Sequence, residues 1–366
     1  MWKGELLKQE IKKHGFSQSI FAKEVGVSKT AVSEWIKGGM PKGENLLRIC
    51  NILQVTPDHF FGNNVPEISI PVHRKKLAGK ITGDSKELSL EIASDYLNLF
   101  RSSKPPALDC NIRNVTDNKE EQLLLANEMR LLSGVQGDSP VRYEDVFALL
   151  AKLNIIPIFK YFPEAVKAYA FQTNISGHRI IFIDVRTNTI DLIFVVLHET
   201  IHSLVYKSES FQTAHYGDLE EEFCDNVASY IQFPPTYIDH IIKNLKGKSG
   251  PEKVFLIKQF AHQNFHATYG VSKIIRQHSK ILNSITPSVF AGADTNIRKR
   301  MPSLIDILYE TDDPRGYVAI LKKLSPVFVQ LVKREIDNVS QRKIAEWLDL
   351  DDIGDARQAI EELRRL

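Results

Sequence analysis

Six consecutive apolar residues, Leu-Ile-Phe-Val-Val-Leu at 192–197, lead directly into His198, Glu199 and, three positions on, His202. An apolar run of this length predicts a segment buried against a sheet. Because the two histidines are four residues apart, they lie one turn apart on the same face of a helix. The chain must therefore contain a buried helix that carries polar side chains, packed in a domain that also has strands.

The order H-E-x-x-H within this helix indicates a metal site. Imidazoles one helical turn apart can both reach a single ion. Glu199 points about a quarter turn away, so it can hold a metal-activated water without binding the metal itself. Zinc lowers the pKa of such a water toward 7, and the glutamate takes its proton. We predict Zn2+ as the cofactor, His198 and His202 as ligands and Glu199 as the catalytic base. The alternative is an exposed histidine pair beside an unrelated acid.

A catalytic zinc needs a third protein ligand and one open position. Residues 219–235 offer three consecutive glutamates. Glu221 is followed four residues later by Asp225, and such a pair places a second carboxylate against a ligand histidine. We therefore choose Glu221 as the third ligand and Asp225 as the carboxylate that supports a histidine. Glu222 and then Glu220 are the alternatives, and two of the three glutamates are expected on a solvated face.

The developing oxyanion needs a donor besides the metal. His215, in the stretch between the two ligand helices, is our candidate catalytic residue for this role. Tyr206, Tyr216 and Tyr230 are weaker candidates, since tyrosines near helices usually pack. Cys224 is expected to be a small buried residue rather than a thiolate ligand of the metal.

Residues from about 120 to 235 resemble the ImmA/IrrE family of zinc metallopeptidases, which are themselves similar to gluzincins. The resemblance rests on the A-x-x-h-R helix at 126–130, the strand in NIIPIF, the H-E-x-x-H helix and the E-x-x-A pattern that begins at Glu221. It implies an endopeptidase whose protein substrate is a transcriptional repressor, and whose action releases a stress, phage or mobile-element response.

Three positions depart from the family pattern. Ile201 stands where the family usually has glycine before the second histidine, Cys224 replaces alanine and Val227 replaces phenylalanine. None of these removes a ligand or the base. The bulk of Ile201 is expected to restrict access to the substrate cleft rather than to weaken metal binding.

Residues 15–39, GFSQSIFAKEVGVSKTAVSEWIKGG, have helix-turn-helix spacing. Ser17 and Ser28 are each placed to cap a helix, and Gly26 supplies the tight turn between them. The positions suited to the interior are Ile20, Phe21, Val25, Val27, Val32 and Trp35. The positions expected to face outward are short, polar or basic: Ser28, Lys29, Thr30, Ser33, Glu34 and Lys37.

This N-terminal stretch resembles the five-helix DNA-binding domain of phage-repressor-type (Cro/C1, XRE) regulators. The Ser-Gln start, Ala22, the Gly-Val-Ser turn and the closing L-x-V-T-P-D-x-F-F all match. Residues 1–62 carry nine Lys/Arg against six Asp/Glu, enough positive charge for phosphate contacts. The resemblance implies binding of double-stranded DNA through the six outward residues. It also implies a homodimer, because one module reads one half-site. The alternative is a helical bundle that mediates dimers.

We therefore expect an α+β multidomain protein. Its parts are an all-α five-helix domain at 1–64, a linker and connecting helix at 65–118, a gluzincin-like metallopeptidase domain with a small sheet at 119–240, and a helical region at 241–366. The stretch VPEISIPVHRKK is typical of a linker or an edge strand. Within the last region we expect a helix break at Tyr269-Gly270 and surface positions for His262 and His266.

The composition favours a cytoplasmic protein that does not enter a membrane. There are 47 basic and 45 acidic residues, so any nucleic-acid contact must come from a local patch. Three cysteines without a C-x-x-C pair fit a reducing compartment. The N-terminus is too polar for a secretory signal. A rival hypothesis of another class remains: a non-enzymatic, antitoxin-like transcription factor whose zinc-binding domain acts as a sensor or an interaction surface.

Overall fold

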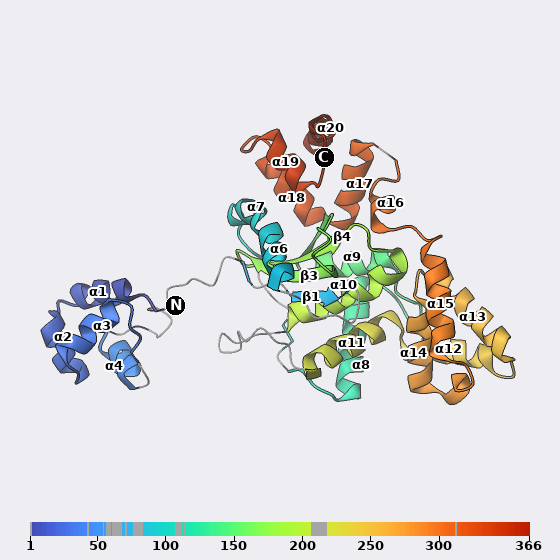
Figure 1. Cartoon of the computed structure of the whole chain (residues 1–366), viewed down its shortest axis with the longest axis horizontal. Coiled ribbons are helices and arrows are strands. Elements are labelled where there is room, and N and C mark those ends of the chain that lie inside the picture. Colours follow the sequence, from blue (N-terminus) through green and yellow to red (C-terminus); the bar gives the residue numbers. More distant parts are fainter. Residues whose placement is uncertain are drawn as a thin grey trace. The chain divides into compact units, whose positions relative to one another are not determined.

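The computed structural model describes residues 2–41, 44–53, 55, 60, 68–69, 72–75, 83–106, 111–112, 114–205, 218–311 and 313–366. The chain divides into two compact units, Met1–Glu67 and Ile68–Leu366 (Figure 1). The first unit has its own hydrophobic core, and the second has a large core around a sheet and a smaller one among helices.

The described part of the first unit is helical. Its helices are α1 (Gly4–Lys13), α2 (Gln18–Val25), α3 (Lys29–Ile36) and α4 (Glu44–Leu53). Ser17 and Ser28 cap α2 and α3, because their hydroxyls accept hydrogen bonds from the backbone N–H groups of Ile20 and Ala31. Gly26 ends α2 with φ 80°, a left-handed angle that costs little only for glycine. The predicted helix-turn-helix is confirmed, and most of the predicted fifth helix falls outside the described residues.

The core of the first unit contains Phe21, Val25, Val32 and Trp35, as predicted. Ile20 was expected in this core but is 53% exposed. The reason is the helical period: α2 buries Phe21, Ala22 and Val25, and Ile20 lies beside that stripe rather than within it.

A mixed sheet lies at the centre of the second unit. Its strands are β1 (Val72–Lys75), β2 (Ile155–Lys160), β3 (Ala168–Ile175) and β4 (His178–Asp184), in the order β1-β3-β4-β2. Strands β2 and β4 are parallel, and the other two pairs are antiparallel. The basic stretch around residue 73 is therefore the edge strand β1. Strand β4 is buried along its whole length, because helices cover it.

Strand β3 was not anticipated from the sequence. It pairs with β4 through a two-residue turn at Ser176 and Gly177, whose φ angles are 50° and 89°. Positive φ at both central residues is the type I′ geometry that matches the twist of a hairpin. This turn aligns Ile175 with His178 and so sets the register of the pair.

Helices before and after the sheet pack against it and against one another. They are α6 (Gly83–Ser94), α7 (Leu97–Arg101), α8 (Lys119–Ser133), α9 (Tyr143–Lys152), α10 (Thr189–Leu204) and α11 (Asp218–Gln232). Gly134 ends α8 with φ 86°, the left-handed angle that is typical of a C-cap glycine. Helix α10 lies on the sheet and beside α11.

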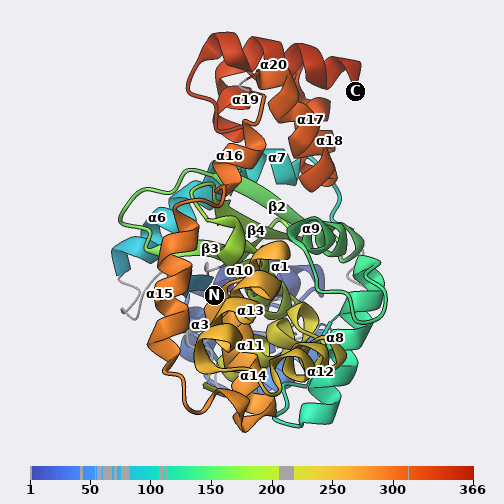
Figure 2. The same ribbon diagram turned by 90° about the vertical axis from the view of Figure 1, so that its right-hand side faces the viewer.

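The region after residue 234 is helical, as predicted. Its elements are α12 (Pro235–Leu245), α13 (Gly250–Gln263), α14 (Thr268–His278), the short 3-10 helix η2 (Lys280–Leu282), α15 (Pro287–Arg298), α16 (Leu304–Leu308), α17 (Pro314–Leu324), α18 (Pro326–Glu335), α19 (Gln341–Trp347) and α20 (Ile353–Arg365). Figure 2 shows α17–α20 at one end of the second unit and α11–α14 at the other. Among the described residues, no helix combines the length and the apolar character that a membrane crossing requires.

Two expectations for this region were wrong. The chain breaks between α13 and α14 at residues 264–267, and Gly270 and Ser272 lie inside α14. His266 was expected at the surface but is fully buried, and its Nε2 lies 2.8 Å from the carbonyl oxygen of Val141. His262 is half-buried. The four-residue spacing of His262 and His266 does not indicate whether one helix contains both of them. In the structure, α13 ends at Gln263, between the two histidines.

Candidate metal centre

Helices α10 and α11 bring the predicted metal ligands together. Asn188 caps α10 by accepting a hydrogen bond from the N–H of Ile190, and the apolar residues that follow bury the helix. His198 and His202 are therefore held at 1% and 2% exposure. Glu221 approaches them from the first turns of α11, and its side chain is 47% exposed. The site thus has two buried imidazoles and one partly exposed carboxylate.

The three side chains face one another with potential donor atoms close together. The two imidazole Nε2 atoms are 2.9 Å apart. The Glu221 carboxylate lies 3.5 Å from Nε2 of His198 and 3.4 Å from Nε2 of His202. Ligand atoms around a tetrahedral zinc ion lie about 3.3 Å apart, given bond lengths of about 2.0–2.1 Å. The spacing of this donor set therefore fits zinc with small adjustments.

The other nitrogen of each imidazole is held by a carboxylate. Nδ1 of His198 lies 2.9 Å from Asp225, and Nδ1 of His202 lies 3.1 Å from Glu220. Such contacts fix the tautomer in which Nε2 is free to bind a metal, and they raise the basicity of the ligand. Glu220 was the least favoured of the three glutamates in the sequence, yet it contacts the site. Glu222 is the exposed one.

The charges at the site favour a cation. Hydrogen bonds from His198 and His202 hold the pKa of Glu221 well below its usual range. Burial alone would lower the pKa of His202, but its hydrogen bonds with Cys224, Glu220 and Glu221 raise it overall. Three carboxylates face two imidazoles, so the charge of this cluster favours a bound cation, whether a proton or a divalent metal ion.

Cys224 forms a second donor group with residues of the same site. Its thiol is fully buried, and burial raises its pKa. The potential donor atoms of His202, Glu220 and Cys224 lie within 4.8 Å of one another. Cys224 is thus a small buried residue, as expected, but it also contacts His202. The sequence carries a signal for this that we did not use: Glu220 and Cys224 have the same four-residue spacing as Glu221 and Asp225.

The remaining predicted site residues are either buried near α10 and α11 or lie outside the described residues. Glu199 is buried beside His198, at 1% exposure. Ile201 is fully buried in the apolar core, so its bulk is used in packing. Tyr230 is buried in α11, and burial raises its pKa. His215, Tyr206 and Tyr216 lie outside the described residues.

In the first unit, the outward positions of α3 lie on one surface. Ser28, Lys29, Thr30, Glu34 and Lys37 are exposed, and Ser33 is half-buried. Val32 and Trp35, on the opposite face of the helix, are buried. The first turns of α3 thus present a hydroxyl, an ammonium group and a second hydroxyl to solvent. These are groups that contact phosphates and base edges in DNA complexes.

Comparisons with known proteins support the identity of the first unit. A family model described as helix-turn-helix matches residues 7–60. Repressor protein C2 of Salmonella phage P22 is 33% identical over 73 residues, which are 20% of this chain and 34% of the repressor. The chain therefore matches about a third of the length of that curated relative. No solved structure matches the chain. The N-terminal domain is a helix-turn-helix of the phage-repressor type, and the family model does not extend to the candidate metal centre.

Proposed function

We propose that this chain is a DNA-binding regulator that also hydrolyses a peptide bond at a zinc centre. The observation that carries the proposal is the paired support of the two histidines: Asp225 holds one imidazole and Glu220 the other, so that both Nε2 atoms face Glu221. An ordinary structural ion pair rarely requires two buried imidazoles that point toward the same place. A metal site with an open coordination position requires that arrangement.

His198, His202 and Glu221 would hold the ion. Bound zinc supplies a Lewis acid for the peptide carbonyl and lowers the pKa of an attacking water. Glu199, next to His198 in the sequence and buried at 1% exposure, would take the proton of that water and pass it to the leaving amine. The low polarity around Glu199 strengthens its electrostatic interactions with the reacting groups.

The helix-turn-helix supports the DNA-binding part of the proposal. Lys29 and Lys37 are exposed at the two ends of α3, where they can meet phosphates on either side of a groove. Since one such module reads one half-site, the regulator would act as a homodimer on double-stranded DNA. The resemblance to ImmA/IrrE peptidases supports a transcriptional repressor as the protein substrate.

The decisive variant for the enzymatic part is Glu199→Gln. It keeps the size of the side chain and leaves the three ligands intact, so it should bind zinc as the wild type does. Removal of a general base lowers the rate of hydrolysis by about 10²–10⁴. The rate is measured with phage-type repressors as substrates, the cleavage being followed by mass spectrometry. Equal cleavage by the wild type and Glu199→Gln would refute the proposed enzyme.

One observation favours a second function, in which the zinc domain is a sensor without peptidase activity. The buried thiol of Cys224 next to His202 and Glu220 provides a mixed sulfur, nitrogen and oxygen donor set. Structural zinc sites commonly combine cysteine and histidine ligands and leave no open position. A zinc-loaded protein that binds DNA in a zinc-dependent manner, and in which Glu199→Gln changes nothing, would support the sensor.

A further inference from the structure

A pocket of about 270 Å³ lies in the second unit between α10, α11, α14 and α15. Its walls include Phe194 and Val195 from α10, Ser229 and Gln232 from α11, and Gly270 from α14. None of the metal ligands proposed above lines it. The pocket is therefore distinct from the proposed metal centre. Its function depends on how close it lies to that centre.

The faces of α10 and α11 that carry the metal centre also lead to the pocket. On α10, steps of three or four residues run from His202 through His198 to Phe194 and Val195, and residues at such steps share one helix face. On α11, the same steps run from Glu221 through Asp225 to Ser229. The Phe194 ring also contacts the imidazole of His198, with centroids 6.2 Å apart. The pocket thus begins one helical turn from a metal ligand.

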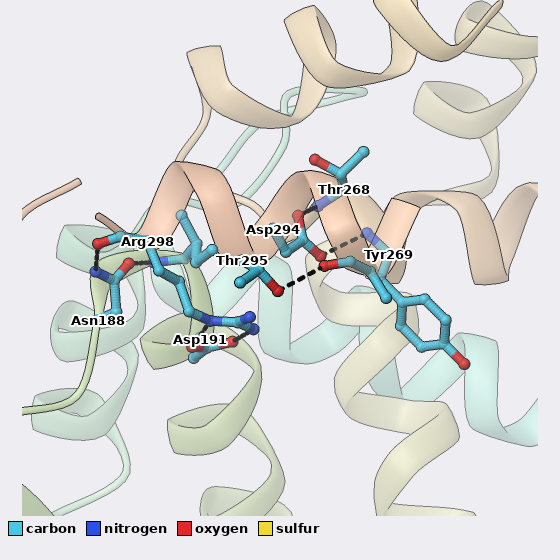
Figure 3. Close-up of polar contacts among 9 residues, drawn as sticks. Asn188, Asp191, Thr268, Tyr269, Asp294, Thr295 and Arg298 are labelled. Atoms are coloured by element: carbon cyan, nitrogen blue, oxygen red, sulfur yellow. Dashed lines mark hydrogen bonds and ion pairs between the residues drawn. The ribbon is translucent and has the colours of Figure 1, made fainter. Parts of the chain in front are cut away.

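The far wall of the pocket is fixed by buried and paired charges. The buried Asp294 of α15 accepts hydrogen bonds from the first two backbone N–H groups of α14, at Thr268 (2.7 Å) and Tyr269 (2.9 Å). Arg298 of α15 forms two hydrogen bonds with Asp191 of α10, at 2.7 and 2.8 Å (Figure 3). The carboxylates of Asp191 and Asp294 and the guanidinium of Arg298 are therefore engaged within the protein, and they hold α14 and α15 against α10. Lys273 of α14 also lines the pocket and is exposed.

The lining left for a ligand is largely apolar and aromatic. Four aromatic side chains line the pocket: Tyr169, Phe194, Phe233 and Tyr269. A Cβ atom at Gly270 would be in ordinary van der Waals contact with the Phe233 ring, at 3.7 Å, so a larger side chain at this position would take up space in the pocket. Pockets that enclose whole small molecules usually measure about 300–1,000 Å³. The observed volume lies just below that range and suits a single large side chain.

We propose that this pocket binds the aromatic side chain of the substrate residue next to the bond that is cut. This inference rests on the proposed peptidase function, and it specifies the substrate class: a protein segment with Phe, Tyr or Trp adjacent to the scissile bond. The aromatic lining supplies edge and face contacts for such a ring. The helix faces shared with His198 and Asp225 place the ring beside the reacting peptide bond.

The first test uses the full-length, metal-free chain, so that it does not depend on zinc. Saturation-transfer NMR is recorded with N-acetyl-phenylalaninamide and with N-acetyl-alaninamide. The phenylalanine compound should bind and the alanine compound should not. Gly270→Leu should abolish the signal, because the added side chain fills the pocket, and it replaces a helical glycine by a better helix former. Absence of phenylalaninamide binding to the wild type would overturn the proposal.

Gly292→Leu is the matched control. Gly292 is an exposed helical glycine of α15, and a Cβ atom there meets none of the described atoms within 4 Å. This variant should bind N-acetyl-phenylalaninamide as the wild type does. If both leucine variants lose binding to the same extent, the effect of Gly270→Leu is not local, and the pocket assignment fails.

The second test connects the pocket with the metal centre. Phenylalanine hydroxamate and glycine hydroxamate are titrated by calorimetry into the zinc-loaded chain. Burial of a phenyl ring should make the phenylalanine compound about tenfold tighter or more. Gly270→Leu should remove this difference and keep the affinity for glycine hydroxamate. If the two compounds bind equally to the wild type, the pocket does not serve the metal centre. If the chain binds no zinc, the peptidase function itself fails, and the NMR experiment still decides whether the pocket takes an aromatic side chain.

Discussion

Nδ1 of His198 lies 2.9 Å from Oδ1 of Asp225, one turn along α11 from Glu221. This contact fixes the imidazole so that Nε2 points toward the donor set. Loss of a carboxylate in this role typically lowers metal affinity about 10–100-fold. We therefore expect Asp225→Ala to weaken zinc binding by that factor in a competition titration with a chromogenic chelator. Glu222→Ala, which removes an exposed glutamate of the same helix, should leave the affinity unchanged.

Substitution of Cys224 distinguishes the two donor groups that share His202. If zinc binds to His198, His202 and Glu221, Cys224→Ala should retain one equivalent of zinc, because the thiol is not a ligand of that set. The cost of the variant should be limited to packing, since alanine fills most of the same buried space. Zinc content is measured on dialysed protein. Loss of the metal in Cys224→Ala would instead assign the ion to the group of His202, Glu220 and Cys224.

Much of the geometry of the candidate metal centre is encoded locally and was predictable from spacing. The i, i+4 relations of His198 with His202 and of Glu221 with Asp225 determine which side chains share a helix face. The roles of Glu220 and Cys224 depend on how α11 is rotated against α10. The sequence does not reveal that rotation, because Glu220 with Cys224 and Glu221 with Asp225 have the same four-residue spacing.

The fold was predictable where local signals are strong and was missed where they are weak. The serine caps and Gly26 indicated the helix-turn-helix, and the apolar stretch NIIPIF indicated strand β2. Strand β3 contains alanine, glutamine, threonine and asparagine, and it pairs with β1 on one side and β4 on the other. The position of α15 depends on Asp294 and Arg298, whose partners are 25–26 and 107 residues away in the sequence. Such long-range contacts have no local sequence signature.

The exposed start of α3 predicts a salt-dependent contact with DNA. Lys29→Ala should weaken binding to duplex DNA and reduce the slope of log K against log salt by about one, the value for one lost phosphate contact. Fluorescence anisotropy with labelled duplex at several KCl concentrations measures the slope. Lys246→Ala, at an exposed position of the second unit, is the control for charge alone. Equal slopes for Lys29→Ala and the wild type would exclude a phosphate contact at this residue.

Because the imidazole of His266 is buried, we expect the stability of helices α13 and α14 to depend on pH. Burial lowers the pKa of His266 to about 4, below the ordinary value of 6.5. Between these values the unfolded state binds a proton that the folded state does not, so stability falls as the pH falls from about 6.5 to about 4. The loss between pH 7 and pH 5 should be about 2 kcal/mol.

Native-state hydrogen exchange of the amides in α13 and α14 measures this loss. His266→Gln retains a donor for the carbonyl of Val141 and removes the titrating ring, so protection in this variant should change much less between pH 7 and pH 5. His240→Gln, at an exposed position, should behave as the wild type. A wild type whose protection in α13 and α14 is the same at both pH values would contradict the assignment of a neutral buried ring.

The most direct test of the metal centre is the zinc stoichiometry of the chain and of His198→Ala. His198 belongs to the proposed ligand set and not to the group that contains Cys224, so it separates the two. After removal of metal by a chelator and titration with Zn2+, inductively coupled plasma mass spectrometry should find one zinc per chain in the wild type. The same result is expected for the control His262→Ala, whereas His198→Ala should retain none after dialysis. A wild type that binds no zinc, or a His198→Ala variant that keeps a full equivalent, would contradict the proposed centre.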